Sequence, residues 1–246
     1  MKITKDNYEE FYFGEASERF IQSEFYSQGY EATKMSPDIG YDLLVTNCAR
    51  TKFLGEEPRQ YNIQVKSRVC YEKKVCFYID ETEYDSLIGD KNSYLVCVLC
   101  KPEISDGREN IVQYRDLTPK TISNMCESWE IEVLKDKDFL SIDVLKELGI
   151  SFVGYTRQYV WFNSTQLNRL KDENIAYKIT YEDKERWCIN IDISSMMIID
   201  RNDCPCGVSS NSLYNEAKIG YEQQHIKYLV DCDSESNGMF EGDYYL

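Results

Sequence analysis

The segment SYLVCVLC at residues 93–100 constrains the fold more than any other feature of the sequence, because every residue after Ser93 is apolar or aromatic. A short run without alternation of polar and apolar residues is typical of a strand buried on both faces at the centre of a sheet. It is too short to cross a bilayer, which takes about 18–20 apolar residues. We therefore expect a sheet with this strand inside it and both faces covered.

The segments before this strand supply the expected partners. Residues 6–28 carry apolar side chains at near-helical spacing and end at Gly29, which predicts a helix with a glycine stop. Asp80 is placed to cap a second, short helix. Strand-like segments lie at 30–35, 41–47, 61–69 and 74–79, and a polar loop with Gly55 and Pro58 separates the second from the third. Helix, three or four strands, helix and strand in this order predict an α/β fold.

The pattern loosens beyond Pro102, and we place a domain boundary near residue 134. Residues 1–134 are expected to form the α/β domain, and residues 135–246 an accessory α+β domain with an acidic C-terminal tail. The expected strands of the later part of the chain are 111–117, 129–134, 153–162 and 186–193, and the expected helices are 143–148 and 213–229.

The composition and charge of the chain indicate where the protein is located and what it can bind. Residues 1–13 lack a secretory signal, so we expect a soluble, cytoplasmic protein with reduced cysteines and no membrane contact. The formal net charge of −15 opposes indiscriminate binding to nucleic acid. The segment from residue 50 to 74 is an exception, because seven basic residues there outnumber three acidic ones. Besides Lys66, its basic residues are Arg50, Lys52, Arg59, Arg68, Lys73 and Lys74, and we expect these six to guide a DNA strand.

Several polar residues are not explained by a core pattern. Gln64 and Lys66 share one face of the strand at 61–69, because side chains alternate along a strand. Asp42 begins the apolar strand before it, and Glu15 and Glu18 lie on one side of the first helix. If the two strands are neighbours and the helix covers them, these side chains converge.

The chemistry of such a cluster is specific. Carboxylate and amide oxygens are hard ligands that suit Mg²⁺ or Mn²⁺. A lysine beside the ion can hold a water molecule or a phosphate, so the set suits metal-assisted hydrolysis of a phosphodiester. Structural alternatives stay open: Gln64 and Lys66 on a solvated strand face, Asp42 as a turn cap, and the two glutamates on a solvated helix face.

The succession of motifs resembles a known family. The residues are Gly14-Glu15-x-x-Glu18, then Gly40-Tyr41-Asp42-Leu43-Leu44-Val45, then Gln64-Val65-Lys66-Ser67. They are similar to the PD-(D/E)xK nuclease superfamily, and more closely to its GxD…QxK branch, which includes Mrr-like restriction endonucleases and Holliday-junction resolvases. Some relatives of that branch occur in bacterial defence loci. The resemblance covers residues 8–100 and the α-β-β-β-α-β order, and it does not extend to residues 135–246.

The resemblance implies a role for each residue. Asp42 would be the main metal ligand, Gln64 would replace the usual acidic ligand, and the Val65 carbonyl would add an oxygen. Lys66 would be the catalytic lysine. A helix glutamate would complete the site, and Glu15 is favoured over Glu18. The implied fold is a restriction-endonuclease-like core, a mixed sheet flanked by helices. The implied function is a Mg²⁺-dependent deoxyribonuclease in antiphage defence or DNA processing.

Two further interpretations belong beside this one. The neutral Gln64 and the net charge of −15 favour, as an alternative, a non-catalytic subunit that docks on a partner protein or forms a homo-oligomer. Cys204, Cys206, His225 and Cys232 contain zinc-ligand types, but CxC followed by a single His and a single Cys is not a zinc-finger spacing. We therefore expect no Zn²⁺ at Cys204 and Cys206.

Overall fold

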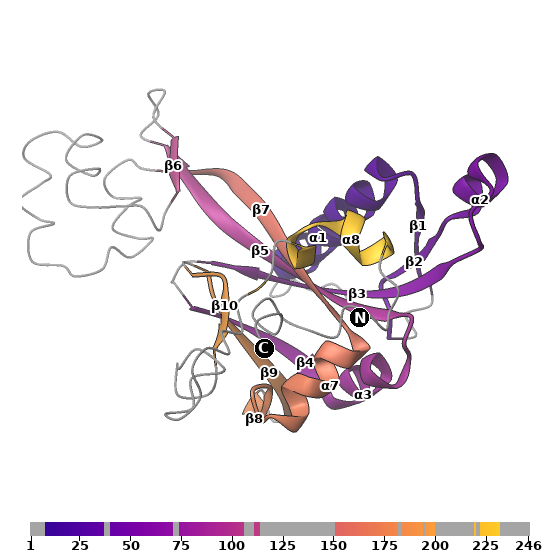
Figure 1. The fold of residues 1–246 in the computed structure, drawn as a ribbon. Helices are drawn as coiled ribbons and strands as arrows, with labels where there is room; N and C mark the ends of the chain where they lie inside the picture. The colour runs from indigo at the N-terminus through magenta and orange to yellow at the C-terminus, as the bar shows by residue number, and fades with distance from the viewer. Residues whose placement is uncertain are drawn as a thin grey trace, which may run out of the picture. The chain divides into compact units, whose positions relative to one another are not determined.

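The fold was analysed in a computed structural model (Figure 1). The structure describes residues 8–36, 40–70, 74–105, 111–113, 151–181, 184–193, 195–199, 219 and 222–231. The expected strands and helices at 129–134 and 143–148, the CxC motif and the acidic tail lie outside these ranges.

The first helix ends as the sequence predicts. Helix α1 spans Tyr8–Ser27, and Gly29 follows it with a φ of 79°, in the left-handed region that favours glycine. The backbone N–H of Gly29 donates to the carbonyl of Tyr26, and that of Tyr30 donates to the carbonyl of Phe25. These two bonds form a Schellman cap, which satisfies carbonyls at the end of the helix.

A mixed sheet contains the buried strand. Its strand order is β1-β2-β3-β5-β6, and β7 also pairs with β5. The bounds are β1 Glu31–Lys34, β2 Leu43–Thr46, β3 Gln60–Val69, β5 Ser93–Ser105, β6 Ile111–Gln113 and β7 Ser151–Asn163. Strands β1 and β2, β2 and β3, and β5 and β6 are antiparallel. Between β3 and β5, bonds from Asn62 to Asn92 and from Cys70 to Cys100 keep a constant offset, which is a parallel arrangement.

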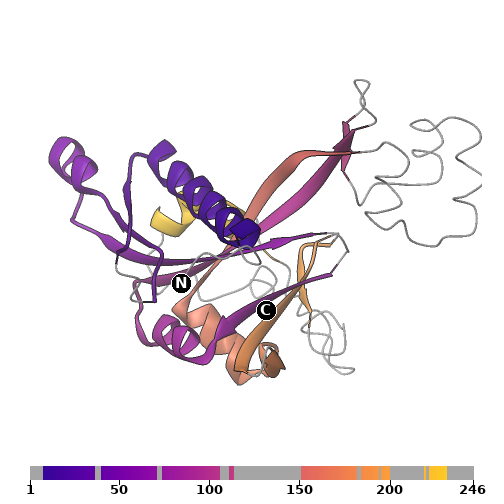
Figure 2. The same cartoon turned by 180° about the vertical axis from the view of Figure 1, so that it is seen from behind.

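Strand β5 confirms the expectation from its apolar sequence. Every side chain from Tyr94 to Cys100 is buried. The ring of Tyr94 packs edge-on against those of Tyr61 in β3 and Trp161 in β7. Helix α1 lies against β1 and β2 in both views of the fold (Figures 1 and 2). The expected mixed α/β class, with a mixed sheet flanked by helices, is confirmed and is consistent with a restriction-endonuclease-like core.

The strand at 74–79 joins a second sheet rather than the first. Strand β4, Lys74–Asp80, pairs antiparallel with β9, Lys184–Asp192, and β9 also pairs with β8, Tyr177–Tyr181, and β10, Met197–Ile199. Segments on either side of residue 134 therefore share one sheet. Residue 134 lies outside the described ranges, and a domain division there stays a prediction.

Two helices cover part of the second sheet and lie side by side in Figure 1. Helix α3 spans Glu81–Gly89, and its Asp80 N-cap confirms the predicted start. Helix α7 spans Ser164–Asp172 and begins with a capping box in which Asn163 and Gln166 bond each other's backbone N–H. The buried Tyr84 of α3 donates its hydroxyl to the Leu167 carbonyl at 2.7 Å.

Two local expectations are wrong. The segment expected to be a polar loop contains helix α2, Cys48–Leu54, which buries none of its side chains. The helix expected at 213–229 is interrupted, because a 3₁₀ turn at Glu222–Gln224 and helix α8 at Ile226–Asp231 are separated by His225. Residues 213–218 lie outside the described ranges.

The chain divides into two compact units. One comprises residues 1–68, 74–98 and 159–246, and the other comprises residues 69–73 and 99–158. All residues of the site described below belong to the first unit. Of the helices in the described ranges, none has the combined length and apolar character that a bilayer crossing requires.

Candidate active site

Asp42 lies where the chain enters β2, between two neighbouring strands. Gly40 has a φ of 96°, a conformation that glycine adopts readily, and turns the chain just before it. The backbone N–H of Asp42 donates to the Ile63 carbonyl in β3, and its own carbonyl accepts from the N–H of Met35, each at 2.9 Å. The backbone of this aspartate is therefore fixed from both sides.

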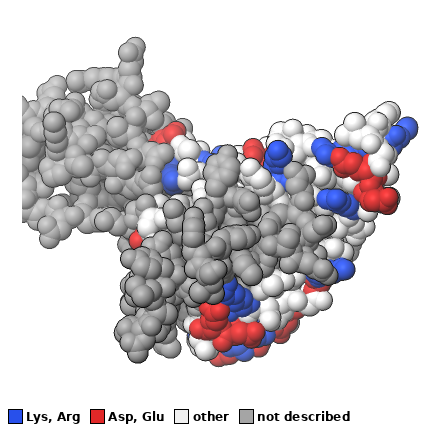
Figure 3. Space-filling view, in the orientation of Figure 1, with Lys and Arg blue, Asp and Glu red and all other residues white. Residues whose placement is uncertain are grey.

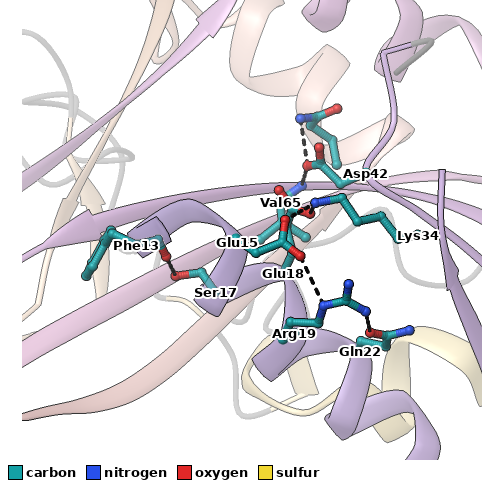
Figure 4. Close-up of polar contacts among 10 residues, drawn as sticks. Phe13, Glu15, Ser17, Glu18, Arg19, Gln22, Lys34, Asp42 and Val65 are labelled. Carbon is teal, nitrogen blue, oxygen red and sulfur yellow. Dashed lines mark hydrogen bonds and ion pairs between the residues drawn. The ribbon is translucent and has the colours of Figure 1, made fainter. Parts of the chain in front are cut away.

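The Asp42 carboxylate bonds directly to β3. Its Oδ2 accepts a hydrogen bond from Nε2 of Gln64 at 2.8 Å and another from the backbone N–H of Val65 at 2.7 Å (Figure 4). Hydrogen bonds to an ionised carboxylate are stronger than those between neutral groups. The structure thus brings together three of the predicted site residues.

Gln64 is buried, unlike a polar residue on a solvated strand face. Its side chain is buried, with 4% relative exposure, although it is a polar residue in the middle of a strand. The amide nitrogen bonds Asp42, whereas Oε1 is buried without a hydrogen-bond partner among the described residues. An unpaired buried acceptor costs about 1–3 kcal/mol. An amide oxygen held in this way is suited to accept a cation or a donor from a ligand.

Lys66 follows on the same face of β3 but has a partner outside the predicted set. Its Nζ lies 3.0 Å from Oε1 and 2.8 Å from Oε2 of Glu83, in the first turn of α3. Oε2 of Glu83 also accepts from the backbone N–H of Asp80 at 3.3 Å. The start of α3 therefore holds the carboxylate that orients the lysine.

The helix glutamates are engaged elsewhere. Lys34 in β1 is hydrogen-bonded to Glu15, and its Nζ lies 2.7 Å from Oε2 of Glu18 (Figure 4). The bond from Lys34 is the main cause that lowers the pKa of Glu15. Burial alone would lower the pKa of Lys34, but the two glutamates outweigh it and raise that pKa.

The strand register separates these glutamates from Gln64. Lys34 pairs with Leu43, and Leu43 pairs with Ile63, so these three side chains point to one face of the sheet. Gln64 is the next residue after Ile63 and points to the other face. The structure therefore places Glu15 and Glu18 around Lys34, on the α1 side, and not around Gln64.

The donor set suits a divalent cation in part. Asp42 and Oε1 of Gln64 provide a carboxylate and an unpaired amide oxygen, and Mg²⁺ is often held by one or two carboxylates together with several waters. Within the described ranges, no three His, Cys, Asp or Glu side chains cluster closely enough to hold a metal ion. The Val65 carbonyl was expected to be a further ligand. For this residue, the structure shows the hydrogen bond from its backbone N–H to the Asp42 carboxylate.

The basic residues of the 50–74 segment are dispersed, and several bond within the chain. Arg50 pairs with Glu56 and donates to the Gln28 carbonyl at 3.1 Å. Arg59 donates to the Val230 carbonyl at 2.8 Å. Arg68 lies over the Tyr78 ring at 4.9 Å, Lys52 lies over the Phe53 ring at 5.3 Å, and Lys74 begins β4. Lys73 lies outside the described ranges.

The surface charge in Figure 3 agrees with this dispersal. On the face shown, basic and acidic side chains of the described residues stand beside one another. Figure 3 thus shows no broad basic field among the described residues of this face. A DNA strand would meet individual cations there, rather than a continuous positive surface.

Two residues of the site were missed from the sequence. The D-x-x-E spacing of Asp80 and Glu83 indicates a helix start, and it was the only sequence signal that pointed toward Glu83. Nothing local to Lys34 indicates that it binds two glutamates in a helix that precedes it. For the zinc alternative, Cys204, Cys206 and Cys232 lie outside the described ranges, and the backbone carbonyl of His225 accepts from Trp161 Nε1 at 3.2 Å.

The protein is therefore an α/β protein with two polar pairs at its candidate site. One is the carboxylate–amide pair of Asp42 and Gln64, and the other is the lysine–glutamate pair of Lys66 and Glu83. No family model and no curated protein matches the chain. Among solved structures, it is similar to that of Archaeoglobus fulgidus Hjc, a Holliday junction resolvase from an archaeal hyperthermophile. The identity is 18%, the match covers 42% of this chain and 71% of that chain, and the TM-score is 0.26.

Proposed function

We propose that this protein is a divalent-metal-dependent nuclease of the PD-(D/E)xK type that hydrolyses DNA phosphodiester bonds. The observation that carries the proposal is the contact between the half-buried Asp42 carboxylate and the buried Gln64 amide, which leaves Gln64 Oε1 unpaired among the described residues. Lys66, on the same face of β3, supports it. These residues match the positions at which the sequence resembles the family.

Asp42 and Gln64 would hold Mg²⁺ or Mn²⁺ through their oxygens. When bound, the ion supplies Lewis-acid polarisation of a phosphoryl oxygen and favours ionisation of a water molecule near neutral pH. Lys66 donates hydrogen bonds to the phosphate and stabilises the negative charge that develops on it. Because Glu83 accepts from the Lys66 ammonium with both oxygens, Lys66 acts as a cationic donor rather than as a base. Glu83 fixes its position.

Participation of Glu15 or Glu18 as a further ligand requires the ion pairs with Lys34 to open and the carboxylate to move from the α1 side of the sheet towards the face of Gln64. The variant Lys34→Met removes that cation. If a helix glutamate joins the site on metal binding, this variant binds Mn²⁺ more tightly than the wild type. Unchanged Mn²⁺ affinity in the variant would restrict the site to Asp42 and Gln64.

A cleavage assay tests the proposed function. The full chain is incubated with single-stranded DNA, duplex DNA, a four-way junction and RNA, each with Mg²⁺, Mn²⁺ or EDTA. The proposal predicts cleavage of at least one DNA substrate that needs the metal and falls at least about 100-fold in Asp42→Asn. Cleavage that is equal in the wild type and in Asp42→Asn would come from a contaminant and would contradict the assignment. Roles in antiphage defence or DNA processing, and a cytoplasmic location, are proposed on the family resemblance.

The alternative is a non-catalytic subunit that docks on a partner protein. Two observations favour it: Lys66 already has a carboxylate partner, and no cluster of three metal-ligating side chains is found in the described ranges. It predicts no metal-dependent cleavage of any substrate in that assay. It also predicts unchanged function of the partner complex when Asp42 is replaced by Asn.

A further inference from the structure

Helix α3 is fixed by elements that lie outside the part of the chain covered by the family resemblance. It contacts helix α7 and strand β9, which both begin after residue 163. The main contact is made by Tyr84, which is fully buried. The Tyr84 ring stacks on that of Trp187 in β9, with centroids 5.0 Å apart, and its hydroxyl donates to the Leu167 carbonyl in α7. One residue of α3 is therefore held by two later elements.

Charged side chains connect the same parts of the structure. Three ion pairs link α3 and its N-cap to later elements: Lys171 of α7 with Asp85, Lys178 of β8 with Glu81, and Arg186 of β9 with Asp80. The ammonium groups of Lys171 and Lys178 also lie over the Trp187 ring, 5.4 and 5.5 Å from its centroid. Exposed ion pairs individually contribute little to stability, so the buried stack of Tyr84 and Trp187 carries most of this contact.

The first turn of α3 carries the partner of Lys66. Glu83 directly precedes Tyr84 and lies between Glu81 and Asp85 in the sequence. Its two oxygens lie 3.0 and 2.8 Å from the Lys66 ammonium, and the Glu83 and Lys66 side chains are 23% and 25% exposed. Because such a hydrogen bond spans about 2.7–3.2 Å, a displacement of α3 by about 1 Å would break it. The orientation of Lys66 therefore depends on the contacts that fix α3.

We propose that helix α7 and strands β8 and β9 form a positioning element for Lys66. Trp187 fixes Tyr84 and thereby fixes α3. Glu83 then holds the Lys66 ammonium on the face of β3 that also carries Gln64. Trp187 and Tyr84 are positioning residues that act through Glu83. The placement of Lys66 is independent of the proposed function, and only its consequence for cleavage rests on that function.

Acylation of lysines in the full chain tests the placement of Lys66. The reagent is an N-hydroxysuccinimide ester of acetate, peptide-resolved mass spectrometry measures the rate, and the exposed Lys91 is the internal reference. Glu83→Ala removes the carboxylate and should accelerate acylation of Lys66, because the reagent attacks an unpaired amine. Trp187→Leu removes the stack and should accelerate it at least about threefold, whereas Trp187→Phe keeps an aromatic ring and should stay closer to the wild type. An unchanged Lys66 rate in Glu83→Ala or in Trp187→Leu would overturn the proposal.

Tyr84→Phe is the milder second variant. It keeps the ring that stacks on Trp187 and removes the hydrogen bond to the Leu167 carbonyl, so it should accelerate acylation of Lys66 at least about twofold. Amide hydrogen exchange in β5 should be unchanged in both variants, which separates a displaced α3 from general unfolding. If exchange in β5 rises in Trp187→Leu, Tyr84→Phe decides, and an unchanged Lys66 rate in that variant contradicts the proposal.

Cleavage kinetics test the consequence that rests on the proposed function. Trp187→Leu should lower the single-turnover rate about threefold in the wild-type background and cause no further loss in Glu83→Ala, because both changes act on Lys66 by one route. Equal losses in the two backgrounds would contradict the route through Glu83. Absence of cleavage by the wild type would count against the nuclease proposal alone, because the acylation result requires no activity.

Discussion

Asp42 and Gln64 meet through a single carboxylate oxygen. Oδ2 of Asp42 accepts both the Gln64 side-chain amide and the Val65 backbone N–H, at 2.8 and 2.7 Å. One neutral amide oxygen can therefore reproduce both bonds. The structural role of Asp42 can thus be separated from its charge by a single isosteric substitution.

Asp42→Asn and Asp42→Ala should differ in stability. The asparagine keeps an acceptor for both donors, whereas the alanine leaves the Gln64 amide and the Val65 N–H without one. Each unsatisfied buried donor costs about 1–3 kcal/mol, so Asp42→Ala should lose at least about 1 kcal/mol more unfolding free energy than Asp42→Asn. Urea unfolding measures the difference. Equal losses would show that these bonds contribute little to the fold.

Lys66 and Glu83 should contribute unequally to activity. Lys66→Met removes the cation that would contact the phosphate and should reduce single-turnover cleavage at least about 100-fold. Glu83→Gln keeps an acceptor that orients Lys66 and should reduce cleavage less than about 10-fold. A loss for Glu83→Gln as large as that for Asp42→Asn would instead identify Glu83 as a metal ligand.

The pair of Glu15 and Lys34 should make stability depend on pH. Because the folded-state pKa of Glu15 is below its ordinary value of 4.5, the pair stabilises the fold above that pH. This contribution is lost as the pH falls through the lower, folded-state pKa. Glu15→Gln should thus cost about 0.5–1 kcal/mol at pH 7 and progressively less below pH 4.5.

Urea titrations of wild type and variant at several pH values measure this effect. Glu57→Gln, at an exposed position, is the control. A difference between Glu15→Gln and wild type that stays constant down to pH 3 would rule out the ion pair as its origin.

Helix α2 should depend on one side chain of β1. The Glu31 carboxylate accepts the backbone N–H groups of Cys48 and Ala49, both at 2.8 Å, and α2 buries no side chain. These bonds outweigh burial and lower the pKa of Glu31. Glu31→Ala should destabilise α2 locally by about 1 kcal/mol.

Amide hydrogen exchange resolves that local effect. Exchange within α2 should become roughly fivefold faster in Glu31→Ala, while exchange in β5 stays unchanged, because α2 contributes nothing to the core. Faster exchange throughout the chain would contradict a local role.

The elements that local signals determine were predicted well. The apolar run of β5, Gly29 after α1 and Asp80 before α3 each act within one segment, and the structure confirms all three. Helix α2 was missed because its N-terminal acceptor is Glu31, seventeen residues before Cys48. The pairing of β4 with β9 joins segments that are about a hundred residues apart and carries no local signal.

In the candidate site, too, the features set by local signals were predicted and the contacts between distant segments were not. Alternation along β3 correctly places Gln64 and Lys66 on one face, and the neighbouring strands bring Asp42 to Gln64. The partners of Lys66 and of the two helix glutamates depend on where α3 and β1 lie in space. Glu83 and Lys34 therefore became visible only in the structure.

Binding of Mn²⁺ to the wild type and to Asp42→Asn, measured by calorimetry with and without a short DNA duplex, tests the central claim most directly. We predict saturable binding by the wild type and its loss in Asp42→Asn, which keeps the hydrogen bonds of the site and hence the fold. Equal binding by both proteins, or no binding by the wild type under either condition, would contradict a metal site at Asp42 and Gln64.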